Sequence, residues 1–204
     1  RIARETFKLQ QDDDAVLIGI ISRLAEQKGF YELTDGDPSA LERMLTHLPI
    51  QIVLIGTGDT VLEDRLKVLA TRHPNLSVNM IFSNEAAHVV EAGSDFFLMP
   101  SRYEPCGLNQ MYSLAYGTVP IVRKTGGLAD SVLDIDDPTG NGTGIVFEPM
   151  TGEAIYGAVE RAVQLWQDDK VRLDQIRMRG MTIDFSWNQS AREYERIYNG
   201  SKRG

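Results

Sequence analysis

Short apolar runs recur along the chain and predict its strands. The run 16–21, Val-Leu-Ile-Gly-Ile-Ile, is rich in β-branched residues and has no polar alternation, which is typical of a strand buried on both faces. Comparable runs lie at 51–55, 78–82, 96–99, 119–122 and 144–147. The pattern therefore predicts a sheet whose strands are covered on both sides.

Helical patterns fill the intervals between these runs. Thr60 and Glu63 have the spacing of a capping box, and apolar residues at helical spacing follow them. Shorter helices are predicted over 108–116 and 128–133, each preceded by glycine. From 151 to about 200 the pattern is helical throughout.

Alternation of strand and helix predicts an α/β fold with a doubly wound, mostly parallel, Rossmann-like sheet and helices on both faces. Residues 1–204 are expected to form a single domain, with the helical segment 151–200 at its C-terminal end. The segments 35–39 and 136–144 are rich in Gly, Asp and Pro and predict surface turns.

Composition and charge narrow the class of ligand. The net charge of −8 argues against a nucleic-acid backbone or an anionic membrane as partner. No apolar run approaches the roughly 20 residues that span a bilayer, and no signal peptide is recognisable. A single cysteine excludes an internal disulfide framework. The chain begins at Arg1 and reads as a piece of a longer protein.

The segment 100–110, Pro-Ser-Arg-Tyr-Glu-Pro-Cys-Gly-Leu-Asn-Gln, carries the most informative candidate chemistry. It follows the apolar run 96–99, and ligands of open α/β sheets bind at the carboxyl ends of strands. Backbone amides at the helix start of Gly107 and Leu108 suit a phosphate, while Glu104 suits sugar hydroxyls. This combination predicts a nucleotide-sugar site. The alternative is an ordinary acidic residue at a helix start.

A second cluster, 22–29, follows the first strand. Arg23 offers a planar fork of donors and Lys28 a compact charge, and both suit phosphate oxygens. The alternative is a solvated loop in which Glu26 pairs with one of the two cations.

Three weaker signals have a structural alternative. Gly56-Thr57-Gly58-Asp59 lacks the third glycine of a dinucleotide fingerprint, and a tight turn with Asp59 or Thr60 as N-cap is the favoured interpretation. Phe82, expected to end the third strand, suits stacking on a nucleobase but also core packing. The segment 124–128 is either another anion-binding helix start or a tight turn.

Two further kinds of chemistry find no support in the pattern. His47, His73 and His88 show no metal-ligand spacing, and no nucleophile-elbow signature is present. Cys106 has no histidine nearby in sequence and is interpreted as a small packing residue rather than a nucleophile.

The segments 100–112 and 116–132 closely resemble bacterial glycogen synthases and plant starch synthases, as do 22–29, 56–59 and Phe185-Ser186-Trp187. The resemblance spans nearly the whole chain but covers only the C-terminal, donor-binding half of that family's GT-B fold. The N-terminal acceptor domain, with its own Lys-x-Gly-Gly-Leu motif, is absent from the chain. The segment 124–128 has a similar sequence but lies in the C-terminal half, so the role of that motif is not transferred to it.

The resemblance implies retaining transfer of glucose from ADP-glucose to the non-reducing end of an α-1,4-glucan. By this resemblance, Arg23 and Lys28 bind the diphosphate. The backbone amides of Gly107 and Leu108 bind the distal phosphate. Glu104 binds the glucose hydroxyls and stabilises the positive charge that develops at the anomeric carbon. Glu104, Arg23 and Lys28 are thereby the predicted catalytic residues.

The resemblance also assigns the remaining donor-binding positions. Phe82 stands where the family commonly stacks a Tyr on adenine, and Tyr112 where many related transferases hold ribose with a second Glu. Asn109 replaces a frequent Thr, and Cys106 belongs to the same donor-binding segment.

The predicted partners are ADP-glucose or ADP and, through the missing domain, a glucan; no cofactor, metal, nucleic acid or membrane is expected. The expected location is the cytoplasm, or the plastid stroma in a plant. The alternatives are a related transferase that uses another nucleotide sugar such as UDP-glucose, and a non-catalytic module that senses nucleotide or glucan.

One departure from the family pattern follows Lys28. The family usually continues in one amphipathic helix, whereas here Thr34-Asp35-Gly36-Asp37-Pro38 is expected to break such a helix.

Overall fold

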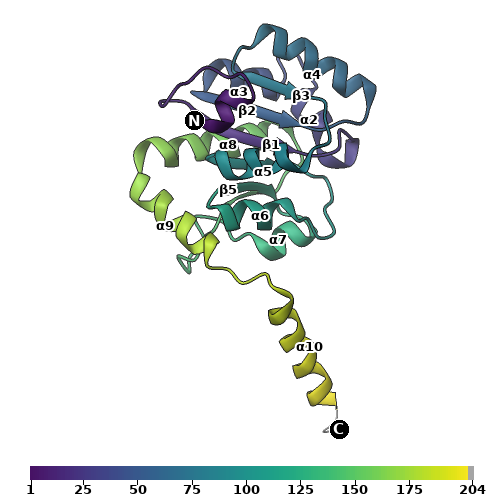
Figure 1. Ribbon diagram of the computed structural model, residues 1–204, viewed down its shortest axis with the longest axis vertical. Coiled ribbons are helices and arrows are strands. Elements are labelled where there is room, and N and C mark those ends of the chain that lie inside the picture. The colour runs from purple at the N-terminus through teal and green to yellow at the C-terminus, as the bar shows by residue number, and fades with distance from the viewer. Residues whose placement is uncertain (202–204) are drawn as a thin grey trace.

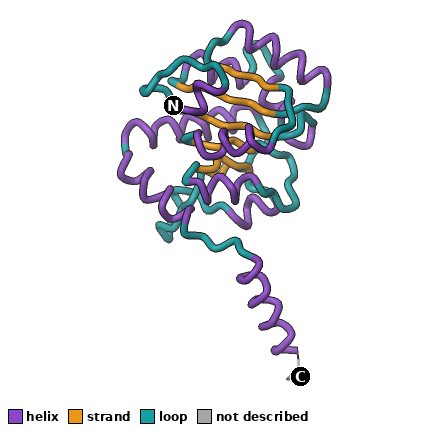
Figure 2. The backbone as a smooth tube through the Cα atoms, in the orientation of Figure 1, coloured by secondary structure: helices purple, strands orange, loops and turns teal. Residues whose placement is uncertain are grey.

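The structure is a computed structural model that describes residues 1–201. A parallel sheet lies at its centre (Figure 2), with the strand order β3-β2-β1-β4-β5-β6. The strands are β1 (Val16–Ile21), β2 (Ile50–Ile55), β3 (Leu76–Asn79), β4 (Phe96–Met99), β5 (Val119–Arg123) and β6 (Ile145–Phe147). The predicted doubly wound α/β fold is confirmed.

Successive residues of the strands point to opposite faces, so each unbroken apolar run serves two cores. In β1, Val16, Ile18 and Ile20 enter one core, and Leu17 enters the other. Because both faces are covered, the strands have no need for polar alternation.

The first of these cores is covered by α2 (Phe30–Thr34), α3 (Ala40–His47), α4 (Thr60–Arg72), α8 (Gly152–Asp168) and α9 (Lys170–Met181). The opposite core is covered by α1 (Ile2–Thr6), α5 (Asn84–Gly93) and α7 (Gly126–Ser131). The helix α6 (Asn109–Tyr116) lies beside α5 and α7, and a 3₁₀ turn, η1 (Glu26–Lys28), precedes α2. The helix α10 (Trp187–Ser201) extends away from this body (Figure 1).

The third strand begins and ends earlier in the chain than the sequence predicts. It covers 76–79 rather than 78–82, because it bonds to β2 alone and β2 ends at Ile55, opposite Asn79. Phe82 therefore lies beyond the strand, in the loop before α5, and does not end a strand as predicted.

The capping box predicted for Thr60 and Glu63 is wrong. Asp59 is the N-cap of α4, and its Oδ1 accepts a hydrogen bond from the amide of Val61. Glu63 instead accepts from the amide of Gly58 through Oε1. The helix predicted over 128–133 also begins and ends two residues earlier, at 126–131.

The helix break predicted at 34–38 is confirmed. The first helix after Lys28, α2, ends at Thr34, and α3 begins after Ser39. Ser39 and Glu42 form the capping box of α3, with Ser39 Oγ accepting from the amide of Glu42 at 3.2 Å.

The glycine pair after β2 allows two loops to lie in backbone contact. A Cβ atom added to Gly56 would lie 1.8 Å from the carbonyl oxygen of Ser22, which belongs to the loop after β1. The amide of Leu24 donates to Thr57 O, and the amide of Asp59 donates to Leu24 O. The structure therefore supports the interpretation of this motif as a tight turn, whose glycines allow close contact with the loop after β1.

Gly56→Ala is expected to lower the free energy of unfolding by about 1–3 kcal/mol or more, because its methyl group would meet a backbone oxygen that cannot turn aside. Urea denaturation measures this change. The matched control is Gly157→Ala in α8, where a Cβ meets nothing within 4 Å. That substitution should stabilise the helix by up to about 1 kcal/mol. Wild-type stability in the Gly56 variant would contradict the close approach.

Candidate functional site

Two adjoining cavities open at the carboxyl ends of β1 and β4. The chain leaves β1 toward α2 on one face of the sheet and leaves β4 toward α6 on the other. This divergence opens a crevice between the two loops. The larger cavity has a volume of about 410 Å³ and the smaller about 170 Å³. Both are lined by Ile21, Ser22, Arg23 and Asn109.

The smaller cavity contains an ion pair between two of the predicted catalytic residues. Nζ of Lys28, at the end of η1, contacts Oε2 of Glu104, in the loop between β4 and α6. Ser101 Oγ donates to the same carboxylate oxygen at 3.3 Å. Glu104 is 8% exposed, so little water screens this pair. The alternative, in which Glu26 pairs with Arg23 or Lys28, is not present in the described residues.

Backbone packing holds both partners of this ion pair in place. Gly29 has φ +79°, and a Cβ there would lie 1.9 Å from Pro100 O, so the turn that carries Lys28 rests directly on the loop after β4. On the other side, the amide of Gly127 donates to Glu104 O at 2.9 Å. The helix break at 34–38 lies on the far side of α2 and leaves Lys28 beside Glu104.

The start of α6 offers amide donors to this cavity. Leu108 is the N-cap and makes no side-chain capping hydrogen bond. Within residues 1–201, the amides of Gly107 and Leu108 donate to no protein acceptor. The buried Gln110 holds this loop, because its Nε2 donates to the carbonyls of Cys106 and Gly107. An uncapped helix start beside a lysine is a favourable position for an anion.

The segment 124–128 packs against the same loop. A Cβ at Gly127 would lie 2.1 Å from Cys106 O, so this glycine is required for the close approach. Lys124 pairs with Glu148 at 2.6 Å and is largely exposed. Of the two alternatives for this motif, the structure favours the tight turn over a second anion site.

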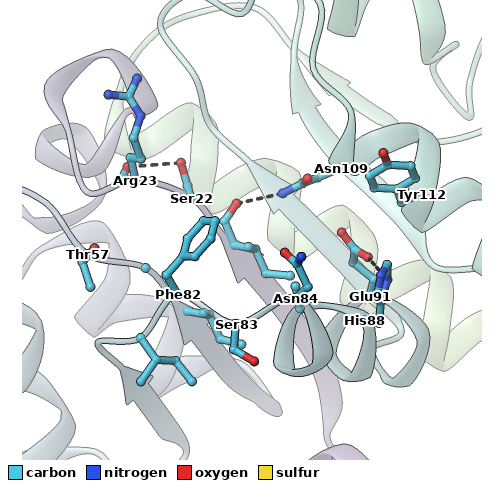
Figure 3. A pocket seen from close by; sticks show the side chains of 15 residues that line it. Ser22, Arg23, Thr57, Phe82, Ser83, Asn84, His88, Glu91, Asn109 and Tyr112 are labelled. Atoms are coloured by element: carbon cyan, nitrogen blue, oxygen red, sulfur yellow. Dashed lines mark hydrogen bonds and ion pairs between the residues drawn. The ribbon is translucent and has the colours of Figure 1, made fainter.

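Arg23 and Cys106 are both exposed. The guanidinium of Arg23 makes no ion pair or hydrogen bond in the described part of the chain, and Figure 3 shows it extending away from Asn84, His88 and Glu91. Cys106 is exposed rather than packed as predicted, and it lines neither cavity.

The larger cavity lies between the loop that carries Phe82 and the helices α5 and α6 (Figure 3). Phe82 is 95% exposed, so its ring is free to contact a ligand and does not serve the core. Asn109 Nδ2 donates to Ile21 O at 3.1 Å and ties the start of α6 to the end of β1. Tyr112 follows on α6 and contributes to the wall.

Polar residues of α5 complete this wall, and their contribution was not predicted from the sequence. Asn84, His88 and Glu91 all line the cavity (Figure 3). Glu91 is 2% exposed, and its Oε2 lies 3.2 Å from His88 Nδ1. Burial raises the pKa of the Glu91 carboxyl above its ordinary value, and His88 partly offsets that rise. A signal was available, since Glu91 is the one acidic residue in the run 86–93.

None of the helices in the described residues combines the length and hydropathy needed to cross a bilayer. Residues 1–201 also hold no cluster of three or more His, Cys, Asp or Glu side chains arranged to bind a metal ion.

Similar proteins cover almost all of this chain. A protein named glycogen synthase from Treponema denticola is 43% identical over 97% of this chain and 40% of its own length. Another of that name, from Myxococcus xanthus, is 49% identical over 93% of this chain and 38% of its own length. The chain thus spans about two fifths of these curated relatives.

A solved structure agrees with these sequence matches. The catalytic domain of starch synthase IV from Arabidopsis thaliana, bound to ADP and acarbose, aligns with a TM-score of 0.86 and 34% identity. The alignment covers 98% of this chain and 41% of that one. The family model described as "Glycosyl transferases group 1" matches residues 2–177, and the chain therefore belongs to the glycosyl transferases group 1 family.

Proposed function

We propose that this chain is the ADP-glucose-binding part of a glycogen or starch synthase. The complete protein would transfer glucose, with retention, to the non-reducing end of an α-1,4-glucan. The observation that carries the proposal is the ion pair of Lys28 and Glu104 beside the uncapped start of α6. The similarity to glycogen synthases and to a starch synthase bound to ADP supports the choice of donor.

In this proposal the diphosphate binds in the smaller cavity. The amides of Gly107 and Leu108 donate to the distal phosphate, and Lys28 and Arg23 contribute positive charge. Arg23 borders both cavities and has no protein partner among the described residues, so it is available to a ligand. When the bond between the anomeric carbon and the phosphate oxygen breaks, its electron pair stays with ADP. The two cations stabilise that charge in place of a metal ion.

Glu104 binds glucose hydroxyls in the proposed complex and stabilises positive charge at the anomeric carbon. In the complex, Lys28 contacts the Glu104 carboxylate and a phosphate at the same time. This suits a donor in which glucose is bonded to the diphosphate. Phe82 stacks on adenine, because its exposed ring lies at the rim of the larger cavity. Tyr112, Asn109 and the segment of Cys106 complete the proposed donor-binding set.

The acceptor glucan is proposed to bind a domain that precedes this chain in the complete protein. The chain spans only about two fifths of the relatives that it matches. We therefore expect the chain alone to bind nucleotide weakly and to transfer little glucose, because the second half of the cleft is needed to exclude water and to place the acceptor hydroxyl.

Isothermal titration with ADP and with UDP tests the donor assignment. ADP is expected to bind more tightly, because the proposed cavity pairs an exposed aromatic ring with the larger purine. A preference for UDP would instead assign the chain to the alternative transferase that uses a UDP-sugar.

Arg23→Ala and Lys28→Ala are each expected to weaken ADP binding by ~1–3 kcal/mol, as for the loss of a hydrogen bond to a charged group. Only the Lys28 variant should also lower the melting temperature, since it leaves the buried Glu104 without its cation. Lys67→Ala, on the exposed surface of α4, serves as the control and should change neither quantity. Unchanged affinity in both variants would mean that the diphosphate binds elsewhere.

Glu104→Gln is expected to lower kcat for glucan synthesis by about 100-fold or more, because it removes charge that acts on the transition state. Affinity for ADP should change little, since ADP lacks the sugar. The assay requires the protein that carries both halves, with Glu26→Gln, an exposed residue of η1, as the control. Undiminished synthesis would exclude Glu104 from the mechanism and would favour a non-catalytic module.

A further inference from the structure

The carboxylate of Glu91 is an unsatisfied acceptor in the wall of the larger cavity. Glu91 is 2% exposed, and its Oε2 is buried without a hydrogen-bond partner. Burying a carboxylate without donors costs free energy, so the free protein bears a penalty at this position. The ion-pair contact with His88 compensates it only in part, because the imidazole is 57% exposed and lacks the geometry of a hydrogen bond.

The fold holds Glu91 in this position. Its own carbonyl accepts a hydrogen bond from Thr118 Oγ1, which fixes this part of α5 to the start of β5. The helix also packs closely on the sheet, because a Cβ at Gly19 of β1 would lie 2.6 Å from Val90 Cγ1. With the backbone fixed on both sides, the side chain points toward the cavity from which a donor can come (Figure 3).

The shape of the cavity indicates which donor would reach it. Phe82 lies at one side, and Asn109 and Arg23 mark the junction with the smaller cavity. A nucleotide with its base on Phe82 and its phosphates at the junction must place its ribose in the space between. Glu91 lies across that space from Phe82 (Figure 3). Ribose brings two neighbouring hydroxyl donors, and a carboxylate has two acceptor oxygens and no donor.

We propose that Glu91 binds the ribose of the donor nucleotide by accepting hydrogen bonds from its 2′ and 3′ hydroxyls. This inference rests on the proposed function and adds to it a residue that recognises the sugar of the nucleotide. The binding of ligand then supplies the donors that the free protein lacks. Residues that bind ligand commonly lower the stability of the free protein, and the buried acceptor of Glu91 fits that pattern.

Calorimetry with ADP and 2′-deoxy-ADP tests the contact in wild-type protein and in Glu91→Gln. Wild-type protein is expected to bind ADP about 10- to 100-fold more tightly than 2′-deoxy-ADP, the factor for a hydrogen bond to a charged group. Glu91→Gln should weaken ADP binding by a similar factor and leave 2′-deoxy-ADP almost unchanged. Glu85→Gln, an exposed residue of the same helix, is the matched control and should behave as wild type.

The outcomes separate this inference from the proposed function. If Glu91→Gln weakens both nucleotides equally, the ribose contact is overturned. If the variant instead loses discrimination between ADP and inosine diphosphate, which lacks the amino group of adenine, Glu91 reads the base and the inference is wrong. If wild-type protein binds no ADP, the proposed function fails and the inference fails with it.

Thermal denaturation supplies the second half of the test. Burial raises the pKa of the Glu91 carboxyl when the protein folds. The protonated carboxyl therefore favours the folded state below about pH 4.5, and this contribution to stability is lost as the pH rises through the pKa of the folded protein. Glu91→Gln is therefore expected to raise the melting temperature more at pH 7.5 than at pH 5. A lower melting temperature at pH 7.5 would mean that the carboxylate serves the fold rather than a ligand.

Discussion

The parallel direction of every strand is the constraint on which the site depends. Parallel strands all end at one edge of the sheet, and each chain segment must leave there toward one face or the other. The strands β1 and β4 are neighbours in the sheet, and their loops leave toward opposite faces. Polar residues that are 76 positions apart, Lys28 and Glu104, thereby become partners in one crevice.

The charges of the crevice are arranged in two different ways. Lys28 and Glu104 pair with each other, so the smaller cavity holds two charged groups in the free protein and neither is left unpaired. Glu91 has only the exposed His88 beside it, and its buried Oε2 has no hydrogen-bond partner, so the carboxylate carries a penalty that an incoming donor would reduce. The Lys28–Glu104 pair holds two charged groups in position for a charged substrate. In our proposal, the Glu91 carboxylate makes the affinity for the nucleotide depend on its ribose.

Local signals in the sequence were informative about chemistry and less so about element boundaries. The sequence predicts a ligand site in the loops after β1 and β4, because Arg23, Lys28 and Glu104 follow apolar runs. Each of these runs forms a strand that ends at the edge of the sheet. The apolar neighbours of Phe82 predict a strand end there, yet β3 stops where its partner β2 stops. The spacing of Thr60 and Glu63 predicts a capping box for α4, although Asp59, the other N-cap that the sequence allows, accepts the amide hydrogen bond. The first error depends on where the partner strand ends, and the second on which of two neighbouring residues accepts one hydrogen bond.

By itself, the sequence determined the α/β class, the helix break after Thr34 and the residues that stand at the ends of β1 and β4. These features follow from apolar runs, glycine and proline, whose effects act over a few neighbouring residues. Only the tertiary structure decided that Lys28 pairs with Glu104 rather than Glu26, and that Glu91 is buried beside a cavity with its Oε2 lacking a hydrogen bond. The reason is physical: partners and burial depend on which distant backbone segments lie against each other, and no local pattern records that contact.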